Sequence, residues 1–143
     1  MHPVRIRRLD NAVPLPAYQT PGAAGFDLAA STDVLIAPGT IALVPTGLVI
    51  EVPAGYFLGI FARSSTPLKR GLMVANGVGV VDPDYCGPAD EVRIALLNFT
   101  PNPVQVKAGD RLAQGILLPA ERIQWEETTN GKTESRGGFG STG

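Results

Sequence analysis

Short apolar runs recur along most of this 143-residue chain, and glycine, proline or polar residues separate them at close intervals. The runs are rich in β-branched residues and too short for ordinary helices, a pattern that is typical of strands. Strands are therefore expected at Val34–Ile36, Ile41–Val44, Leu48–Val52, Tyr56–Ala62, Leu72–Ala75, Val78–Val81, Val92–Phe99, Val104–Val106 and Leu112–Leu118. The basic N-terminal segment MHPVRIRRLD is interpreted as a further strand with its charges facing solvent.

Glycine and proline exclude long helices from this chain. The sequence contains 17 glycines and 13 prolines, spread over its whole length. Proline is excluded from helix interiors, and glycine destabilises them by about 1 kcal/mol. Only one short helical turn is expected, near Ser65–Arg70. Many short strands with turns between them predict an all-β fold, namely a sandwich, a jelly roll or a barrel.

Composition narrows the classes of function. The net charge of −1, from 12 basic and 13 acidic residues, gives no overall attraction to nucleic acid or to a membrane surface. No apolar run approaches the roughly 20 residues that span a bilayer, and none follows the basic N-terminus as in a signal peptide. The single cysteine, Cys86, favours a reducing compartment, and we expect the cytoplasm. A single histidine, His2, argues against histidine catalysis and against a zinc site.

The composition changes after Trp125, where the sequence EETTNGKTESRGGFGSTG holds only one bulky apolar residue, Phe139. Such a segment buries too little surface to offset the entropy of ordering it, so we expect a mobile tail. The β domain is predicted to span residues 1–130, and a flexible lid residues 131–143. The glycines of the lid, with Ser141 and Thr142, could present backbone N–H groups to an anion. A frayed terminus without a role is the alternative.

A cation and several hydroxyl groups follow the strand expected at Tyr56–Ala62. The segment begins Arg63-Ser64-Ser65 and leads into the predicted helical turn. Arginine offers a planar fork of donors that matches phosphate, and a helix N-terminus adds free N–H groups. On these residues alone, a serine that merely caps the helix is the alternative.

A second candidate segment runs from Asn76 to Gly87. Asn-Gly between two apolar runs predicts a hairpin, and the glycines at 77 and 79 allow another molecule to approach the backbone closely. Asp82 comes at the end of an apolar strand, where partial burial would suit it to act as a general base. An ordinary Asp-Pro-Asp turn, or a metal site at Asp82 and Asp84, are the alternatives.

Taken in order, five segments resemble the five motifs of the trimeric dUTPase family, over nearly the whole chain. They are Ala23–Ala30, Arg63–Gly71, Asn76–Gly87, Arg111–Gln114 and Gly137–Gly143. The resemblance implies a distorted jelly roll or β-barrel of short strands, a homotrimer with shared active sites, and hydrolysis of dUTP to dUMP and pyrophosphate. It also implies Mg²⁺ that is bound mainly through the substrate triphosphate, so no metal-ligating residue is assigned.

The resemblance also implies roles for individual residues. Asp82 is the catalytic base that activates water, Tyr85 lies under the deoxyribose, and Asp27 orients the arginine of the second motif or a magnesium-bound water. The residues that hold uracil are Asn76, Gly79, Val80 and Val81. The phosphate chain is bound by Arg63, Ser64, Ser65 and Gln114. The tail covers the substrate with Phe139 on the uracil ring and, on the phosphates, Gly140, Ser141 and Thr142.

This sequence departs from the family pattern at three places. Glu134 stands where an arginine is usual in the tail, and Arg136 is the nearest substitute for phosphate binding. A few extra residues follow Gly87, shortly before Arg93, which is carried over as a substrate-binding residue. Cys86 replaces a frequent arginine.

Two other functions fit parts of the sequence. A dCTP deaminase shares the fold but needs an acid/base group directed at C4 of cytosine, and the signatures of that activity are not evident here. A non-catalytic β-sandwich interaction module would leave Arg63-Ser64-Ser65, the segment from Asp82 to Tyr85 and the glycine-rich tail unexplained. The partners expected are dUTP and further copies of this chain, and neither nucleic acid nor membrane.

Overall fold

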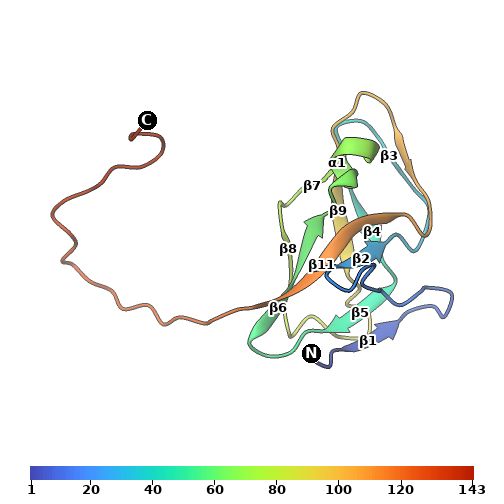
Figure 1. Ribbon diagram of the computed structural model, residues 1–143, viewed down its shortest axis with the longest axis horizontal. Coiled ribbons are helices and arrows are strands. Elements are labelled where there is room, and N and C mark those ends of the chain that lie inside the picture. The colour runs from blue at the N-terminus through green and yellow to red at the C-terminus, as the bar shows by residue number, and fades with distance from the viewer.

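The computed structural model describes residues 1–143 as an all-β unit with one short helix (Figure 1). Its strands are β1 (Arg5–Arg8), β2 (Phe26–Ala29), β3 (Val34–Ile36), β4 (Ile41–Pro45), β5 (Leu48–Glu51), β6 (Tyr56–Ala62), β7 (Leu72–Val74), β8 (Gly79–Val81), β9 (Arg93–Asn98), β10 (Val104–Val106) and β11 (Arg111–Pro119). The helix, α1 (Ser65–Arg70), follows β6 and ends at Gly71. No helix is long and apolar enough to cross a membrane.

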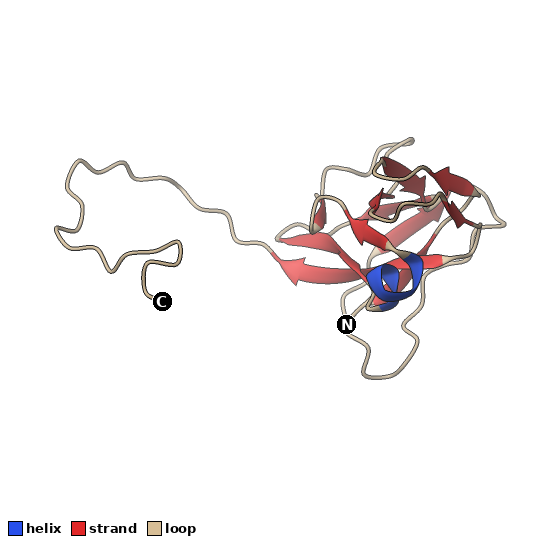
Figure 2. Ribbon diagram, turned by 90° about the horizontal axis from the view of Figure 1, so that it is seen from above, coloured by secondary structure: helices blue, strands red, loops and turns tan.

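The strands pair antiparallel in four small sheets. The two larger sheets have the strand orders β2-β11-β6-β8 and β4-β9-β7, and the two smaller ones are β1-β5 and β10-β3. Many neighbours in space are distant in sequence, as where β11 lies between β2 and β6. The sheets surround one core (Figure 2) and do not close into a barrel. Of the two expected forms, the structure therefore has the open, jelly-roll-like one.

One continuous core fills the space between the sheets. It consists of 18 buried apolar residues, and strands of every sheet contribute to it. Strand β9 illustrates the pattern, because Ile94 and Leu96 are fully buried whereas Arg93 is exposed. Successive side chains of a strand point to opposite faces, so a sheet with one buried face has alternating apolar positions. The apolar pattern of the sequence thus follows from a single-domain core.

Most of the expected elements are confirmed. The nine strands predicted from the apolar runs begin and end within one residue of the expected bounds, and α1 has the expected bounds. The N-terminal strand is present as β1. Strand β2 was not expected, because it has only four residues and one of them is Asp27. It is a strand because β11 supplies its backbone partners, with a register shift between Arg111 and Ala113.

The hairpin expected at Asn76-Gly77 is wrong. Strand β7 pairs with β9, and β8 pairs with β6, so the turn between β7 and β8 passes from one sheet to another. The turn itself is tight, because the N–H of Gly77 donates to the carbonyl oxygen of Val74 at 3.0 Å. Gly77 adopts a φ of +72°, which glycine allows at no steric cost. Local sequence determines such a turn but not which strands pair on either side of it.

After β11 ends at Pro119, the chain has no further strand or helix and runs away from the sheets (Figures 1 and 2). All residues from 121 onward are exposed. The extended segment therefore begins before residue 131, where the lid is predicted to begin. The functional boundary between domain and lid stays a prediction.

Candidate functional site

Two arginines share one carboxylate at an end of the four-stranded sheet. The Oδ1 atom of Asp27 lies 2.9 Å from Nε of Arg63, and its Oδ2 atom lies 3.0 Å from Nη1 of Arg111. The Asp27 side chain is only 12% exposed, whereas the arginines are more accessible. Arg63 also donates from Nη1 to the carbonyl oxygen of Arg111 at 2.9 Å. The arrangement carries a net positive charge and holds the Arg63 guanidinium in a defined direction.

Strand pairing brings these residues together. Strand β11 lies between β2 and β6, and Gln114 is opposite both Asp27 and Phe61. The Nε2 atom of Gln114 donates to the carbonyl oxygen of Ala62 at 3.0 Å, directly before Arg63. Gly25 packs closely on the same side chain, since a Cβ there would lie 2.7 Å from Oε1 of Gln114. The first, second and fourth candidate segments thus meet at one end of one sheet.

The hydroxyls after Arg63 do not cap α1, so the capping alternative is not observed. Ser64 makes no side-chain capping hydrogen bond. Thr66, which is 1% exposed, anchors the turn instead. Its hydroxyl accepts from the backbone N–H of Arg63 at 3.1 Å and donates to the carbonyl oxygen of Leu112 at 2.8 Å. The hydroxyls of Ser64 and Ser65 make no hydrogen bond within the chain and are free to donate to a ligand.

The far end of α1 is tied to the strand that carries Arg111. Arg70 pairs with Asp110 at 2.9 Å, and the same carboxylate oxygen accepts from the backbone N–H of Lys107 at 2.9 Å. Burial raises the pKa of Asp110, but the Lys107 hydrogen bond and the Arg70 guanidinium lower it by more. The net result is a pKa below the ordinary value of 3.8. Asp110 therefore stays ionised at neutral pH and holds α1 beside the start of β11.

Strand β8 and the residues after it form a second candidate region. Strand β8 pairs with β6 on one side only, so backbone groups on its other edge have no strand partner. Asp82, directly after β8, is exposed, so the partial burial expected for it is not observed in the single chain. Tyr85 is 41% exposed, and its hydroxyl donates to the carbonyl oxygen of Glu91 at 2.9 Å. Asn76 is exposed in the turn before the strand.

The two regions lie at opposite ends of β6. Val81 is opposite Leu58, near the start of β6, whereas Arg63 follows its end. Five residues of extended chain separate Leu58 from Arg63, which corresponds to about 17 Å. Pro119, from which the tail departs, is opposite Tyr56 and so lies at the Asp82 end. One chain therefore brings Asp27, Arg63 and Gln114 together but does not bring Asp82 to them.

The remaining predicted residues contact neither region. Arg136 and Phe139 lie in the exposed tail, and Phe139 adopts a positive φ of 51°. Ser141 accepts from the backbone N–H of Gly138 at 2.7 Å, within a turn of the tail itself. Arg93 is exposed at the start of β9, opposite Pro45.

The cluster of Asp27, Arg63, Thr66, Arg111 and Gln114 is called the arginine site below. Two of its residues were not among the predicted site residues. Arg111 shares Asp27 with Arg63, and Thr66 anchors the turn that carries Arg63. The position of Arg111 at the head of the fourth motif was a usable signal. No sequence signal pointed to Thr66, because its partner on Leu112 comes from a distant strand.

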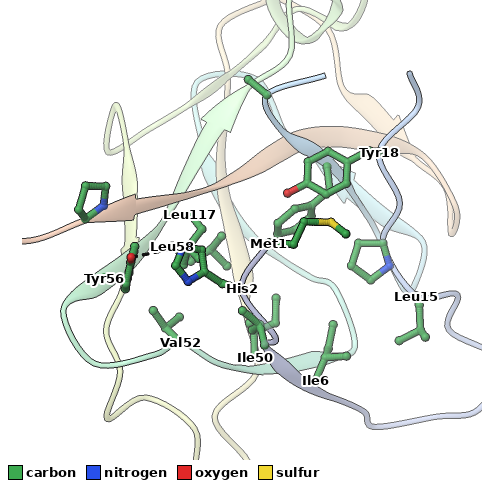
Figure 3. Close-up of a pocket in the computed structure, with 15 residues that line it drawn as sticks. Met1, His2, Ile6, Leu15, Tyr18, Ile50, Val52, Tyr56, Leu58 and Leu117 are labelled. Carbon is green, nitrogen blue, oxygen red and sulfur yellow. Dashed lines mark hydrogen bonds between the residues drawn. The ribbon is translucent and has the colours of Figure 1, made fainter. Parts of the chain in front are cut away.

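An apolar pocket of about 760 Å³ lies beside β1, β5 and β6 (Figure 3). Its lining is mostly hydrophobic and includes Ile50, Leu58 and Leu117. At its rim the Tyr56 hydroxyl lies 3.4 Å from Nε2 of His2. None of the predicted site residues lines it. No group of three or more histidine, cysteine, aspartate or glutamate side chains is arranged to hold a metal ion.

Two arginines held on one carboxylate, beside unengaged hydroxyls, define an all-β protein with a cationic site at one end of its four-stranded sheet. The sequence profile of the dUTPase family matches residues 11–143. A deoxyuridine 5'-triphosphate nucleotidohydrolase from Desulfitobacterium hafniense is 49% identical over 145 residues, covering 95% of this chain and 91% of the relative. The chain belongs to the dUTPase family.

Solved structures agree with this assignment. The dUTPase from Streptococcus mutans matches with a TM-score of 0.78 at 35% identity, covering 87% of this chain and 100% of that one. A mutant dUTPase from phage phi11 of S. aureus, described with a structural Mg(II) ion, matches with a TM-score of 0.79. It is 19% identical and covers 90% of this chain and 98% of its own, so it shows the likeness of fold alone.

Proposed function

We propose that this member of the dUTPase family hydrolyses dUTP to dUMP and pyrophosphate in active sites that are shared among the subunits of a homotrimer. The activity follows from the family, and the shared site is supported by one observation. Asp82 and the Arg63 region lie at opposite ends of β6 in the same chain. A site that contains both must take them from different copies.

The phosphate chain is bound at the Asp27–Arg63–Arg111 cluster. Asp27 and the carbonyl oxygen of Arg111 engage Nε and Nη1 of Arg63, which leaves its outer donors for phosphate oxygens. The free hydroxyls of Ser64 and Ser65 add neutral donors, and Gln114 supports the same strand end. Hydrolysis at a triphosphate depends mainly on positioning and charge neutralisation, and this cluster provides both.

Uracil is read by the free edge of β8. Strand β8, from Gly79 to Val81, has no strand partner on that edge, so its backbone donors and acceptors there suit the O2, N3 and O4 positions of uracil. Cytosine presents reversed donors and acceptors at this edge of the ring, and the methyl group of thymine meets steric crowding. Gly79 and Val80 are the residues at which the base lies closest to the backbone.

Asp82 acts as the general base on the attacking water. The water oxygen forms a bond to the α-phosphorus, the bond from that phosphorus to the bridging oxygen breaks, and pyrophosphate leaves. Asp82 accepts the proton that the water loses. Tyr85 lies under the deoxyribose and leaves no room for a 2′-hydroxyl, which excludes UTP.

The residues of the arginine site fit Mg²⁺ only when it is bound mainly through the phosphates of the substrate. Mg²⁺ keeps several waters and binds through phosphates with one or two carboxylates at most. Asp27 is the carboxylate beside the arginines, and both of its oxygens already accept from guanidinium groups. Contact through water suits it better than direct ligation. When bound, Mg²⁺ neutralises charge on the triphosphate oxygens.

The C-terminal segment closes the site. Phe139 stacks on uracil, while Gly140, Ser141 and Thr142, with Arg136, contact the phosphates. Closure excludes water other than the nucleophile. The exposed, extended course of the tail supports this role, because it leaves these residues free to reach another subunit. We place the enzyme in the cytoplasm on the basis of its single cysteine.

A pyrophosphate-release assay that compares dUTP, dCTP, dTTP and UTP tests the proposal. Turnover is expected with dUTP and at most weakly with the others, since the β8 edge and Tyr85 discriminate base and sugar. Ammonia release from dCTP would instead identify a deaminase. The absence of turnover with all four nucleotides, in protein of confirmed trimeric mass, would favour a non-catalytic interaction module.

A further inference from the structure

The loop between β8 and β9 carries both Asp82 and Tyr85, and it folds as two successive turns. The N–H of Tyr85 donates to the carbonyl oxygen of Asp82 at 3.1 Å and closes the first turn. The N–H of Asp90 donates to the carbonyl oxygen of Gly87 at 3.1 Å and closes the second. The second turn contains the few residues by which this chain exceeds the family pattern.

Asp90 also closes the second turn with its side chain. Its Oδ2 atom accepts from the N–H of Gly87 at 2.7 Å. Asp90 therefore donates to Gly87 through its backbone N–H and accepts from Gly87 through its side chain. The side chain is partly buried. A charge-assisted hydrogen bond of this kind is among the stronger local restraints available to a loop. Arg7 of β1 adds weaker, exposed contacts to the carbonyl oxygens of Gly87 and Pro88 at 3.2 to 3.4 Å.

The residues after Asp90 are fixed on the core. The Glu91 carboxylate accepts from the N–H of Gly47 at 3.0 Å, and the N–H of Val92 donates to the carbonyl oxygen of Leu48 at 2.8 Å. The hydroxyl of Thr46, which is 1% exposed, donates to the carbonyl oxygen of Val92 at 2.6 Å. Glu91 is therefore held by contacts with the core, in addition to the hydrogen bond from its own N–H to the carbonyl oxygen of Ala89 at 2.9 Å.

The Tyr85 hydroxyl reaches this fixed point, because it donates to the carbonyl oxygen of Glu91 at 2.9 Å. We propose that Asp90 is a positioning residue for Tyr85 and thereby for the selection of deoxyribose over ribose. Asp90 restrains the backbone between the turn that carries Tyr85 and Glu91, whose carbonyl oxygen accepts from the Tyr85 hydroxyl. The ring is then held at the position given by its hydroxyl bond to Glu91, where Tyr85 is 41% exposed. This inference rests on the proposed role of Tyr85 under the sugar.

The test compares kcat/KM for dUTP and for UTP in full-length trimers. Asp90→Ala removes the acceptor for the Gly87 N–H, and Asp90→Asn keeps an oxygen in the same place. Tyr85→Phe keeps the ring and removes only the hydroxyl, and Tyr85→Ala removes the ring. Asp33→Ala is the matched control, because its carboxylate also accepts one loop N–H, that of Ala108 at 2.9 Å. Amide exchange at Gly87 reports the restraint directly.

Asp90→Ala is expected to lower the dUTP-to-UTP ratio roughly tenfold, the worth of about one hydrogen bond, and to accelerate exchange at Gly87. Asp90→Asn should retain most of the ratio, and Asp33→Ala all of it. Tyr85→Phe should resemble Asp90→Ala, and the double variant should lose less than the sum of the two effects. If Asp90→Ala does not assemble, Asp90→Glu takes its place, because the extra methylene moves the acceptor away from the Gly87 N–H, and a reduced ratio is expected in it as well.

Three results would overturn the inference, and they differ in what they imply for the proposed function. A normal ratio in Asp90→Ala, or in Asp90→Glu where it takes the place of Asp90→Ala, together with a reduced ratio in Tyr85→Ala, would leave the proposed function intact. It would show that the ring needs no restraint from the second turn. A normal ratio in Tyr85→Ala would remove the proposed role of Tyr85 as well. Additive losses in the double variant would show that Asp90 acts on something other than Tyr85.

Discussion

Two aspartates of this chain have opposite surroundings. Asp27 is 12% exposed and spans two arginines, so both of its oxygens are occupied. Asp82 is exposed and makes no ion pair, so its oxygens are free to accept a proton or to contact a sugar hydroxyl. The same side chain therefore serves to hold cations at one position and is available as a base at the other.

The first prediction concerns Asp82→Asn. The fold, the trimer and dUTP binding should persist, because the amide can still hydrogen-bond the sugar. Turnover should fall by about a hundredfold to ten-thousandfold, since an amide is a poor base for water. Single-turnover hydrolysis and equilibrium binding of dUTP measure the two effects separately. Hydrolysis at nearly the wild-type rate would show that another group is the base.

A second prediction concerns Asp27→Asn. The variant loses the negative charge and one of the two oxygens that hold Arg63 and Arg111, so the two guanidinium groups can no longer share this side chain. The value of kcat/KM for dUTP should fall by about tenfold to a hundredfold, mainly through KM. Glu51→Gln is the control, because Glu51 forms an exposed ion pair with Arg5 at 2.8 Å. Equal losses of kcat/KM in Asp27→Asn and Glu51→Gln would show that the effect comes from the change in surface charge alone.

At the scale of elements, the arginine site depends on how α1 is joined to β6 and β11. Thr66 binds the N–H of Arg63 on one side and the carbonyl oxygen of Leu112 on the other. Arg70 and Asp110 connect the opposite end of the helix to the residue before β11. A helix of six residues has little stability of its own, so these tertiary contacts hold it in place.

The third prediction tests that anchor. Thr66→Val keeps the shape of the side chain but leaves the Arg63 N–H and the Leu112 carbonyl oxygen without their buried partner. The free energy of unfolding should fall by about 1–3 kcal/mol, and the KM for dUTP should rise because Arg63 shifts. Thr40→Val provides the control, because its exposed hydroxyl donates only to Ala37. Denaturant unfolding and steady-state kinetics measure both; equal destabilisation in the two variants would contradict the assignment.

For the whole molecule, the arrangement of the three predicted parts is the main point. The arginine cluster lies at one end of β6, Asp82 at the other, and the tail departs from the Asp82 end without returning to the sheets (Figure 1). A single copy of the chain therefore does not bring these three parts together. The proposed trimer is what would unite the parts.

The fourth prediction tests shared sites by complementation. Deletion of residues 132–143 should abolish activity while trimer mass and melting temperature stay nearly unchanged, because the tail contributes almost no apolar surface to the core. Asp82→Asn trimers should be similarly inactive. Co-refolding the two proteins makes mixed trimers in which some sites combine an intact Asp82 with an intact tail from another copy. Activity should therefore reappear in the mixture.

Separately refolded and then pooled proteins are the control for that experiment. They should stay inactive unless subunits exchange slowly. Native mass spectrometry shows whether mixed trimers formed. If mixed trimers are present and no activity returns, Asp82 and the tail act within one chain, and the proposed sharing is wrong.

The sequence determined much of this protein through local rules. Apolar runs between glycines and prolines predicted nine strands and the position of α1, since alternation and chain breakers act over a few residues. The order of five motifs along the chain indicated the dUTPase family, to which the chain belongs. Three residues of the arginine site, Asp27, Arg63 and Gln114, were likewise identifiable, because they belong to motifs that occur in the family order along the chain.

Pairing over long distances decided the rest. The Asn76-Gly77 turn was correct as a turn but joins two sheets, because β6 and β9 take β8 and β7 as partners. Strand β2 exists because β11 pairs with it, and Thr66 matters because Leu112 lies beside it. Burial of Asp82 could not be read from its apolar neighbours, since it lies just beyond the edge strand. Only the tertiary structure places such residues, because their partners come from segments that the local sequence does not specify.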